Sequence, residues 1–146
     1  MEKIYLATDH AGFELKEKIK QFLIERNFEI EDKGAVEHNE KDDYPDFISL
    51  VAKEISQNPN KKAIIFGGSG QGEAMAANRF PNVRAVVFYG GNLEIIKLSR
   101  EHNDANILSI GARFLNEEEA KTAIELWLNT EFTNEERHIR RIEKIV

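Results

Sequence analysis

The fold is decided by the stretch Phe66-Gly67-Gly68-Ser69-Gly70-Gln71-Gly72-Glu73. It follows the apolar run Ala63-Ile64-Ile65-Phe66, typical of a buried strand, and precedes an alanine-rich run typical of a helix start. Glycines leave room for a ligand, and they permit positive φ, so consecutive backbone N–H groups can point into one concavity. A strand, a glycine-rich turn and a helix N-terminus together predict an anion site, with the carboxyl of Glu73 at its far end.

Known glycine motifs do not describe this loop. The dinucleotide fingerprint G-x-G-x-x-G, counted from Gly68 and Gly70, would need a third glycine where Glu73 stands, and the G-x-x-x-x-G-K-[ST] loop of nucleotide-binding proteins is absent. The loop alone therefore indicates a small anion or an oxyanion. The alternative is an ordinary turn whose first helical residues include an acid that the helix dipole favours.

Composition limits the class of protein. The 146 residues, of which 41% are hydrophobic and 32% charged, predict one globular domain over 1–146. The net charge of −6 argues against nucleic acid and anionic membranes as partners, and the lack of cysteine excludes disulfides and cysteine metal sites. No apolar run approaches the roughly 18 residues of a membrane span, and no signal peptide precedes the first strand pattern, so we expect a cytoplasmic protein.

Strand and helix patterns alternate along the chain. Strands are expected at 3–8, 28–30, 62–66, 83–88 and 106–110, with helices between them and a capping box of Asn116 and Glu119 at the start of the fifth helix. This order predicts an α/β fold: a single doubly wound, Rossmann-like parallel five-stranded sheet with helices on both faces. Residues 133–146 form a C-terminal helical extension, expected to pack across a dimer interface; the alternative is packing on its own domain.

Ligands of open α/β sheets bind outside the carboxyl ends of the strands. The segments expected there are Asp9-His10 after the first strand, the glycine loop, and Arg113 after the fifth strand, with Tyr44 within reach from the second helix. His102-Asn103 falls at the opposite, amino edge, so it is either structural or completes the site of a neighbouring subunit. No role is assigned to His38.

The C-terminal helix carries a basic face. Arg137 and Arg141 stand four residues apart and share that face, with His138 beside them. Arginine binds phosphate through two parallel hydrogen bonds. The alternative is a solvated basic surface.

Six motifs now occur together and in order: Thr8-Asp9-His10-Ala11-Gly12-Phe13-Glu14-Leu15-Lys16, Asp43-Tyr44-Pro45-Asp46, Gly68-Ser69-Gly70-Gln71-Gly72, Ala76-Ala77-Asn78, Arg100-Glu101-His102-Asn103-Asp104-Ala105 and Arg137-His138-x-x-Arg141. Over nearly its whole length the chain resembles the sugar-phosphate isomerase family that holds ribose-5-phosphate isomerase B and the allose-6-phosphate and galactose-6-phosphate isomerases. Many members place a cysteine base just before the glycine loop, where this chain has Gly67. The chain is similar to a branch that uses a glutamate instead, here Glu73.

The resemblance implies an aldose–ketose isomerisation through an enediolate, with no cofactor and no metal. It implies that Glu73 carries the proton, that backbone amides of the loop and Ser69 stabilise the oxyanion, and that His102 of a partner subunit opens the sugar ring. The remaining contacts with substrate are implied for Asp9, His10, Tyr44, Gly68, Gly70, Gln71, Gly72, Asn103, Arg113, Arg137, His138 and Arg141. A homodimer with shared sites is expected, and the sequence leaves open whether dimers pair into tetramers.

Other functions stay open at this stage. The same chemistry on a six-carbon sugar phosphate is the nearest alternative, and a non-catalytic sugar-phosphate-binding protein is another. A receiver-type signalling domain would need an aspartate at the end of the third strand, where this chain has Phe66-Gly67. A nucleic-acid module built on residues 137–141 conflicts with the charge of −6.

Overall fold

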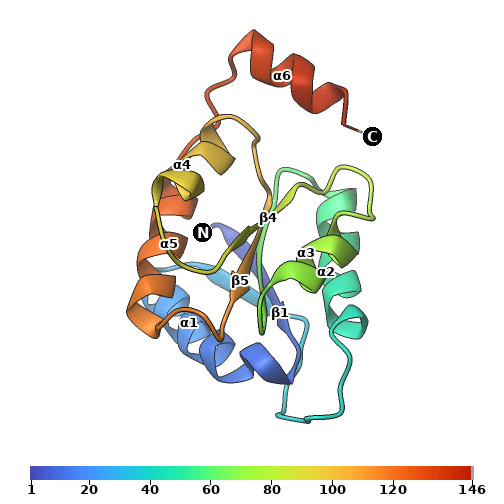
Figure 1. Cartoon of the computed structure of the whole chain (residues 1–146), viewed down its shortest axis with the longest axis vertical. Coiled ribbons are helices and arrows are strands. Elements are labelled where there is room, and N and C mark those ends of the chain that lie inside the picture. Colours follow the sequence, from blue (N-terminus) through green and yellow to red (C-terminus); the bar gives the residue numbers. More distant parts are fainter. Residues whose placement is uncertain (146) are drawn as a thin grey trace.

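Five parallel strands form one sheet in the computed structural model, which describes residues 1–145 (Figure 1). The strand order is β2-β1-β3-β5-β4, so β2 and β4 form the edges and the last strand, β5, inserts between β3 and β4. The strands are β1 (Lys3–Thr8), β2 (Glu29–Asp32), β3 (Lys62–Gly67), β4 (Ala85–Phe88) and β5 (Ile107–Gly111). The predicted doubly wound five-stranded sheet is confirmed.

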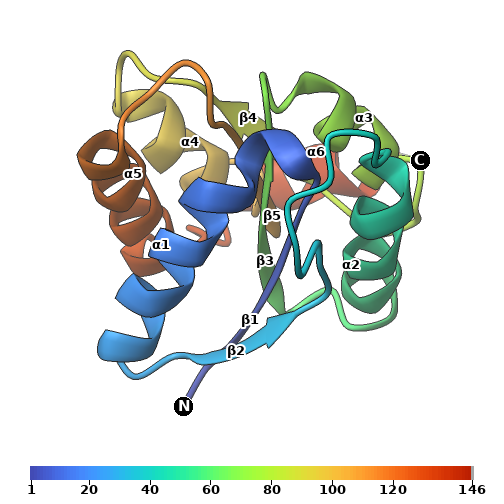
Figure 2. The same cartoon turned by 90° about the horizontal axis from the view of Figure 1, so that it is seen from below.

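Helices cover both faces of the sheet (Figure 2). On one side lie α1 (Phe13–Glu25), α4 (Glu94–Glu101) and α5 (Glu117–Asn129), and on the other lie α2 (Pro45–Gln57) and α3 (Gln71–Ala77). A short 3₁₀ turn, η1 (His10–Gly12), joins β1 to α1. Asn116 with Glu119 forms the predicted capping box of α5, and α2 begins with Pro45 at its first position.

The core has two halves, one on each face of the sheet. Alternate residues of a strand point to opposite faces, so Leu6 joins the core under α1, α4 and α5, whereas Tyr5 joins the core under α2. Trp127 is the largest fully buried side chain of the first core. Both halves hold the carboxyl ends of β1, β3 and β5 in register, with Thr8 opposite Phe66 and Gly67 opposite Gly111.

Four strands have other bounds than predicted. β3 continues to Gly67, β5 spans Ile107–Gly111, and β2 begins at Glu29. The expected strand 83–88 begins only at Ala85, because the side chain of Asn106 accepts the N–H of Arg84 at 2.8 Å in place of a ladder partner. The expected strand 28–30 extends to Asp32, whose carboxylate is held by Lys16.

The C-terminal extension is shorter than predicted. The helix expected over 133–146 is α6 (Glu136–Glu143), because Thr133 is tied to the carbonyl of Glu101 through both its N–H and its hydroxyl, and Asn134 has a φ of +60°. Residue 146 lies outside the described residues. Helix α6 stands beyond the amino edge of the sheet, at the top of Figure 1. Packing across a dimer interface stays a prediction.

Candidate active site

The glycine loop is fixed to the end of the neighbouring strand β5. The hydroxyl of Ser109 donates to the carbonyl of Gly70 at 2.7 Å, and the N–H of Arg113 donates to the carbonyl of Gly68 at 3.0 Å. Gly70 has a φ of +79°, and a Cβ there would lie 3.1 Å from the Ser109 hydroxyl and 3.2 Å from the N–H nitrogen of Gly111. The loop therefore needs glycine at this position both for its conformation and for its contact with β5.

The carboxyl of Glu73 lies in the space that a side chain at position 67 would take. Glu73 is 4% exposed, and a Cβ built on Gly67 would overlap its Cδ, Oε1 and Oε2 atoms. The end of β3 is thus in direct contact with a buried carboxyl group. Gly67 makes room for that group because it has no side chain.

Burial sets the ionisation of Glu73. Removal from water raises the pKa of the Glu73 carboxyl and the negative charge of Asp9 adds to the rise, while hydrogen bonds from the backbone at Glu73 and Gly70 oppose it. Within residues 1–145 no ion pair joins Glu73 to a cation. Burial outweighs the helix N-terminus here, so this carboxyl is suited to take up and release a proton nearer neutral pH.

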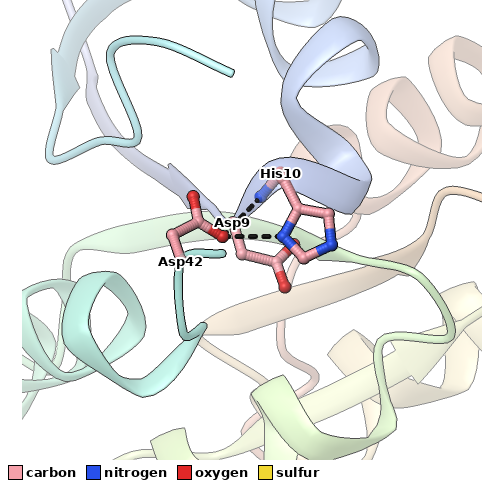
Figure 3. Close-up of side chains that lie close together, drawn as sticks. All are labelled: Asp9, His10 and Asp42. Carbon is pink, nitrogen blue, oxygen red and sulfur yellow. Dashed lines mark hydrogen bonds and ion pairs between the residues drawn. The ribbon is translucent and has the colours of Figure 1, made fainter. Parts of the chain in front are cut away.

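Polar side chains gather around the end of β1. Asp9 is buried and caps the 3₁₀ turn, since its Oδ1 accepts the N–H of Ala11 at 3.0 Å. Oδ1 of Asp42, from the loop before α2, accepts the backbone N–H of His10 at 3.0 Å and lies 2.8 Å from Nδ1 of its ring (Figure 3). The loop before α2 and the turn after β1 are therefore joined at the site.

A pocket of about 410 Å³ opens beside this cluster. Its lining includes His10 and Arg113, together with Glu14, His38 and Glu40. The Arg113 side chain lies over Gly68, where a Cβ would come within 3.2 Å of Nη1. Two basic side chains near a glycine loop suit a phosphate or another anion.

Two further predicted residues border the loop. The Tyr44 ring lies against Gly72, where a Cβ would fall 2.6 Å from the phenol oxygen. Ser69 is exposed and its hydroxyl oxygen accepts the N–H of Gln71 at 3.3 Å, which leaves the hydroxyl hydrogen free to donate. The structure thus brings Tyr44, Ser69 and Gln71 to the same edge as Glu73.

Asp9, His10 and Asp42 are also close enough together for metal binding, with one ligand atom each within 4.8 Å of the others. The Nδ1–Oδ1 separation of 2.8 Å between His10 and Asp42 is that of a hydrogen bond. Two ligands of a tetrahedral zinc ion stand about 3.3 Å apart. His10 and Asp42 are therefore arranged as a hydrogen-bonded pair, while Oδ1 of Asp9 accepts the N–H of Ala11.

The remaining predicted residues lie at the opposite end of the sheet. His102 ends α4 and stacks on His138 of α6, with ring centroids 4.2 Å apart and an interplanar angle of 18°. Asn103, Arg137 and Arg141 are exposed near this pair. Burial, followed by the charge of His102, lowers the pKa of the His138 imidazole. Helix α6 and the end of α4 lie at the opposite end of the sheet from the start of α3, so these elements do not reach the glycine loop of their own chain (Figure 1).

Several residues that support the site carry no clear signal in the sequence. Lys16 is fully buried and its ammonium donates to Asp32 at 2.6 Å and to the carbonyl of Ala35 at 2.8 Å, which anchors the loop that leads to Asp42. At the other end, Arg100 donates to Asp104 and to the backbone beside it, and so fixes the turn that carries His102. Lys16 and Arg100 lie inside the motifs quoted above, and Arg100 shares a helix face with Leu93 and Ile96, but lysine and arginine side chains are rarely fully buried.

Sequence comparison with known proteins matches nearly the whole chain to one family of isomerases. A family model described as Ribose/Galactose Isomerase matches residues 4–145. The chain is 39% identical over 145 residues to ribose-5-phosphate isomerase B of Escherichia coli (strain K12), covering 99% of this chain and 95% of the relative. It is 36% identical over 141 residues to that of Mycobacterium tuberculosis (strain H37Rv), covering 97% of this chain and 86% of the relative.

Solved structures of ribose-5-phosphate isomerases B superpose closely on this chain. The crystal structure of ribose-5-phosphate isomerase B from Mycoplasma genitalium with bound ribulose 5-phosphate superposes with a TM-score of 0.93 at 35% identity, covering 98% of this chain and 93% of the other. The isomerase B of Clostridium thermocellum superposes with a TM-score of 0.91 at 40% identity, covering 98% and 94%. A glycine loop that ends on a buried carboxyl, on this sheet and with these relatives, identifies the chain as a member of the ribose/galactose isomerase family.

Proposed function

We propose that this protein interconverts ribose 5-phosphate and ribulose 5-phosphate. The relatives that match nearly its whole length are ribose-5-phosphate isomerases B, and one of their structures holds ribulose 5-phosphate. The observation that carries the proposal is the buried carboxyl of Glu73 at the end of a glycine loop, which forms no ion pair within residues 1–145. None of the helices within residues 1–145 has the length and apolar character of a membrane span.

The proposed reaction moves one proton from C2 to C1 and one hydroxyl proton from O2 to O1. The Glu73 carboxylate removes the proton from C2 of the open-chain aldose, and the C2–H electron pair forms the enediolate double bond while the C1 carbonyl oxygen takes up negative charge. Glu73 then delivers that proton to C1, the hydroxyl proton of O2 passes to O1, and the carbonyl forms at C2, so atoms and charge balance without a redox partner. The loop amides of residues 68–72 and the Ser69 hydroxyl are proposed to stabilise the developing oxyanion.

Phosphate and sugar contacts are proposed to come from both ends of the sheet. His10, Arg113 and Asp9 lie at the edge with Glu73, whereas His102, Asn103, Arg137, His138 and Arg141 lie at the other edge. We propose a homodimer in which the second copy supplies His102 to open the ring, Asn103 to contact the sugar, and the basic residues of α6 to bind phosphate. The second copy is then part of every site.

Replacement of Glu73 by glutamine tests the proton transfer. E73Q should lower kcat about 100-fold to 10,000-fold, as expected when a general base is lost, and leave ribose 5-phosphate binding within about tenfold. Exchange of the C2 proton with deuterated water, followed by NMR, should stop as well. E94Q is the matched control, since Glu94 is also a first-turn acid but is exposed on α4. Turnover by E73Q near the wild-type rate refutes the role.

Mixing two inactive chains tests the shared site. A dimer of one E73Q chain and one H102N chain contains one site with both groups intact, so verified mixed dimers should recover part of the activity. If mixed dimers of proven composition stay inactive, sharing between subunits is wrong.

Substrate choice is tested by comparing kcat/KM for ribose 5-phosphate and allose 6-phosphate. We expect ribose 5-phosphate to be the better substrate, because the matched relatives are named for it.

The proposed place of action is the cytoplasm, since doubly charged sugar phosphates do not cross a bilayer unaided.

A further inference from the structure

One oxygen of Asp42 makes two contacts with the same residue. Oδ1 accepts the backbone N–H of His10 at 3.0 Å and lies 2.8 Å from the ring nitrogen Nδ1 (Figure 3). The Asp42 side chain is 8% exposed and the His10 side chain 25%. Two contacts to one largely buried oxygen fix both the main chain at His10 and the rotation of its ring.

This arrangement decides which ring nitrogen can face a ligand. A carboxylate accepts hydrogen bonds, so Nδ1 must carry a hydrogen, and Nε2 lies on the side of the ring away from Asp42 (Figure 3). In the neutral ring Nε2 is then an acceptor, which repels an anion. Only the doubly protonated ring donates from Nε2 and attracts an anion.

The charges around His10 favour the protonated ring. The hydrogen bond to Asp42 raises the pKa of the His10 imidazole, burial opposes the rise, Asp9 adds to it, and Arg113 lowers it. Glu14, Glu40 and His38 complete the ionisable lining of the pocket. The nearest negative charge is that of Asp42 itself, in direct contact with the ring.

We propose that Asp42 is a positioning residue that acts through His10: its carboxylate holds the imidazolium with Nε2 turned to the pocket, where it donates to the phosphate of the substrate. This inference rests on the proposed function, because the ligand is taken to be a sugar phosphate. Asp42 itself does not touch the reacting atoms. Its effect is on phosphate binding and on the pH range in which binding is strong.

The first test needs no substrate. The ring signals of His10 are followed by NMR against pH in the free protein and are assigned by their absence in H10Q. In D42N the titration midpoint of His10 should move to lower pH. E40Q removes a negative charge from the same pocket without a contact to His10, and should leave the midpoint near that of the wild type. D42S, which removes the whole carboxylate, is a second variant, and it should lower the titration midpoint of His10 as well. An unchanged midpoint in D42N and D42S overturns the proposal.

The second test uses kinetics. D42N should raise KM for ribose 5-phosphate about tenfold at pH 8, where an unassisted imidazole is neutral, and much less at pH 6, with kcat within about threefold at both. In an H10Q background D42N should add nothing, because Asp42 acts through the ring. A KM that rises equally at both pH values, or an added loss in H10Q, contradicts the proposal. If the wild type does not isomerise ribose 5-phosphate while the NMR midpoint still moves in D42N, the proposed function fails and the contact between Asp42 and His10 stands.

Discussion

Replacing Gly67 by alanine should remove activity while leaving the fold intact. The added Cβ would overlap Cδ and both oxygens of the Glu73 carboxyl, so no rotation of that group about its last bond relieves the clash. The carboxyl has to leave its place. The backbone at Gly67 does not adopt the left-handed conformation, so alanine is acceptable there for the main chain.

The expected loss follows from the role of the displaced group. A positioned general base contributes about 100-fold to 10,000-fold, which corresponds to about 3–5 kcal/mol of activation free energy. The fall should appear in kcat, because the phosphate contacts are elsewhere. The assay is steady-state conversion of ribose 5-phosphate, with urea unfolding of the same samples to show that G67A is folded.

G68A is the matched control in the same loop. A Cβ at Gly68 would lie 3.2 Å from Nη1 of Arg113, the movable end of an exposed side chain, so the expected effect is a higher KM with a smaller change in kcat. A comparison of G67A with G68A therefore separates loss of the general base, seen in kcat, from loss of a phosphate contact, seen in KM. A folded G67A protein with kcat within about threefold of the wild type would refute the placement of Glu73 as the base.

Three further predictions concern stability. Burial raises the pKa of Glu73 in the folded state above its unfolded value, so the folded chain binds that proton more tightly. The free energy of unfolding therefore falls as pH rises through the range between the two pKa values. Measured by calorimetry, E73Q should melt at a higher temperature than the wild type at pH 7, with a smaller difference near pH 4. K16M should cost about 3 kcal/mol in urea unfolding, because Lys16 is fully buried on Asp32, whereas K20M, at a partly exposed position, should cost under about 1 kcal/mol. N116A should cost about 1 kcal/mol through loss of the α5 cap, measured in the same way.

The sequence was informative where local patterns and tertiary structure agree. Alternation of strand and helix patterns predicted the sheet and both helical layers, and a two-residue capping signal placed the start of α5. The glycine loop was placed correctly at the end of β3, and its acid was found at the first turn of α3. The positions of the loop and of its acid depend on residues that are close together in the sequence, so the sequence alone reveals them.

Other features depend on contacts between distant segments. Nothing near Lys16 in the sequence shows that Asp32 and Ala35 will surround its ammonium, because both partners come from a distant segment and a lysine is rarely fully buried. The contact between Asp42 and His10 likewise joins two loops that only the folded chain brings together. The burial that raises the pKa of Glu73 likewise has no local signal, since the depth of a side chain is set by the whole fold.

The shared space of residues 67 and 73 also bears on how the two branches of the family diverge. The resemblance places a thiol at the position of Gly67 in many related chains, in the volume that the Glu73 carboxyl fills here. In this chain that volume holds one group, so a side chain at position 67 and the Glu73 carboxyl exclude each other. We expect the residue types at the two positions to depend on one another.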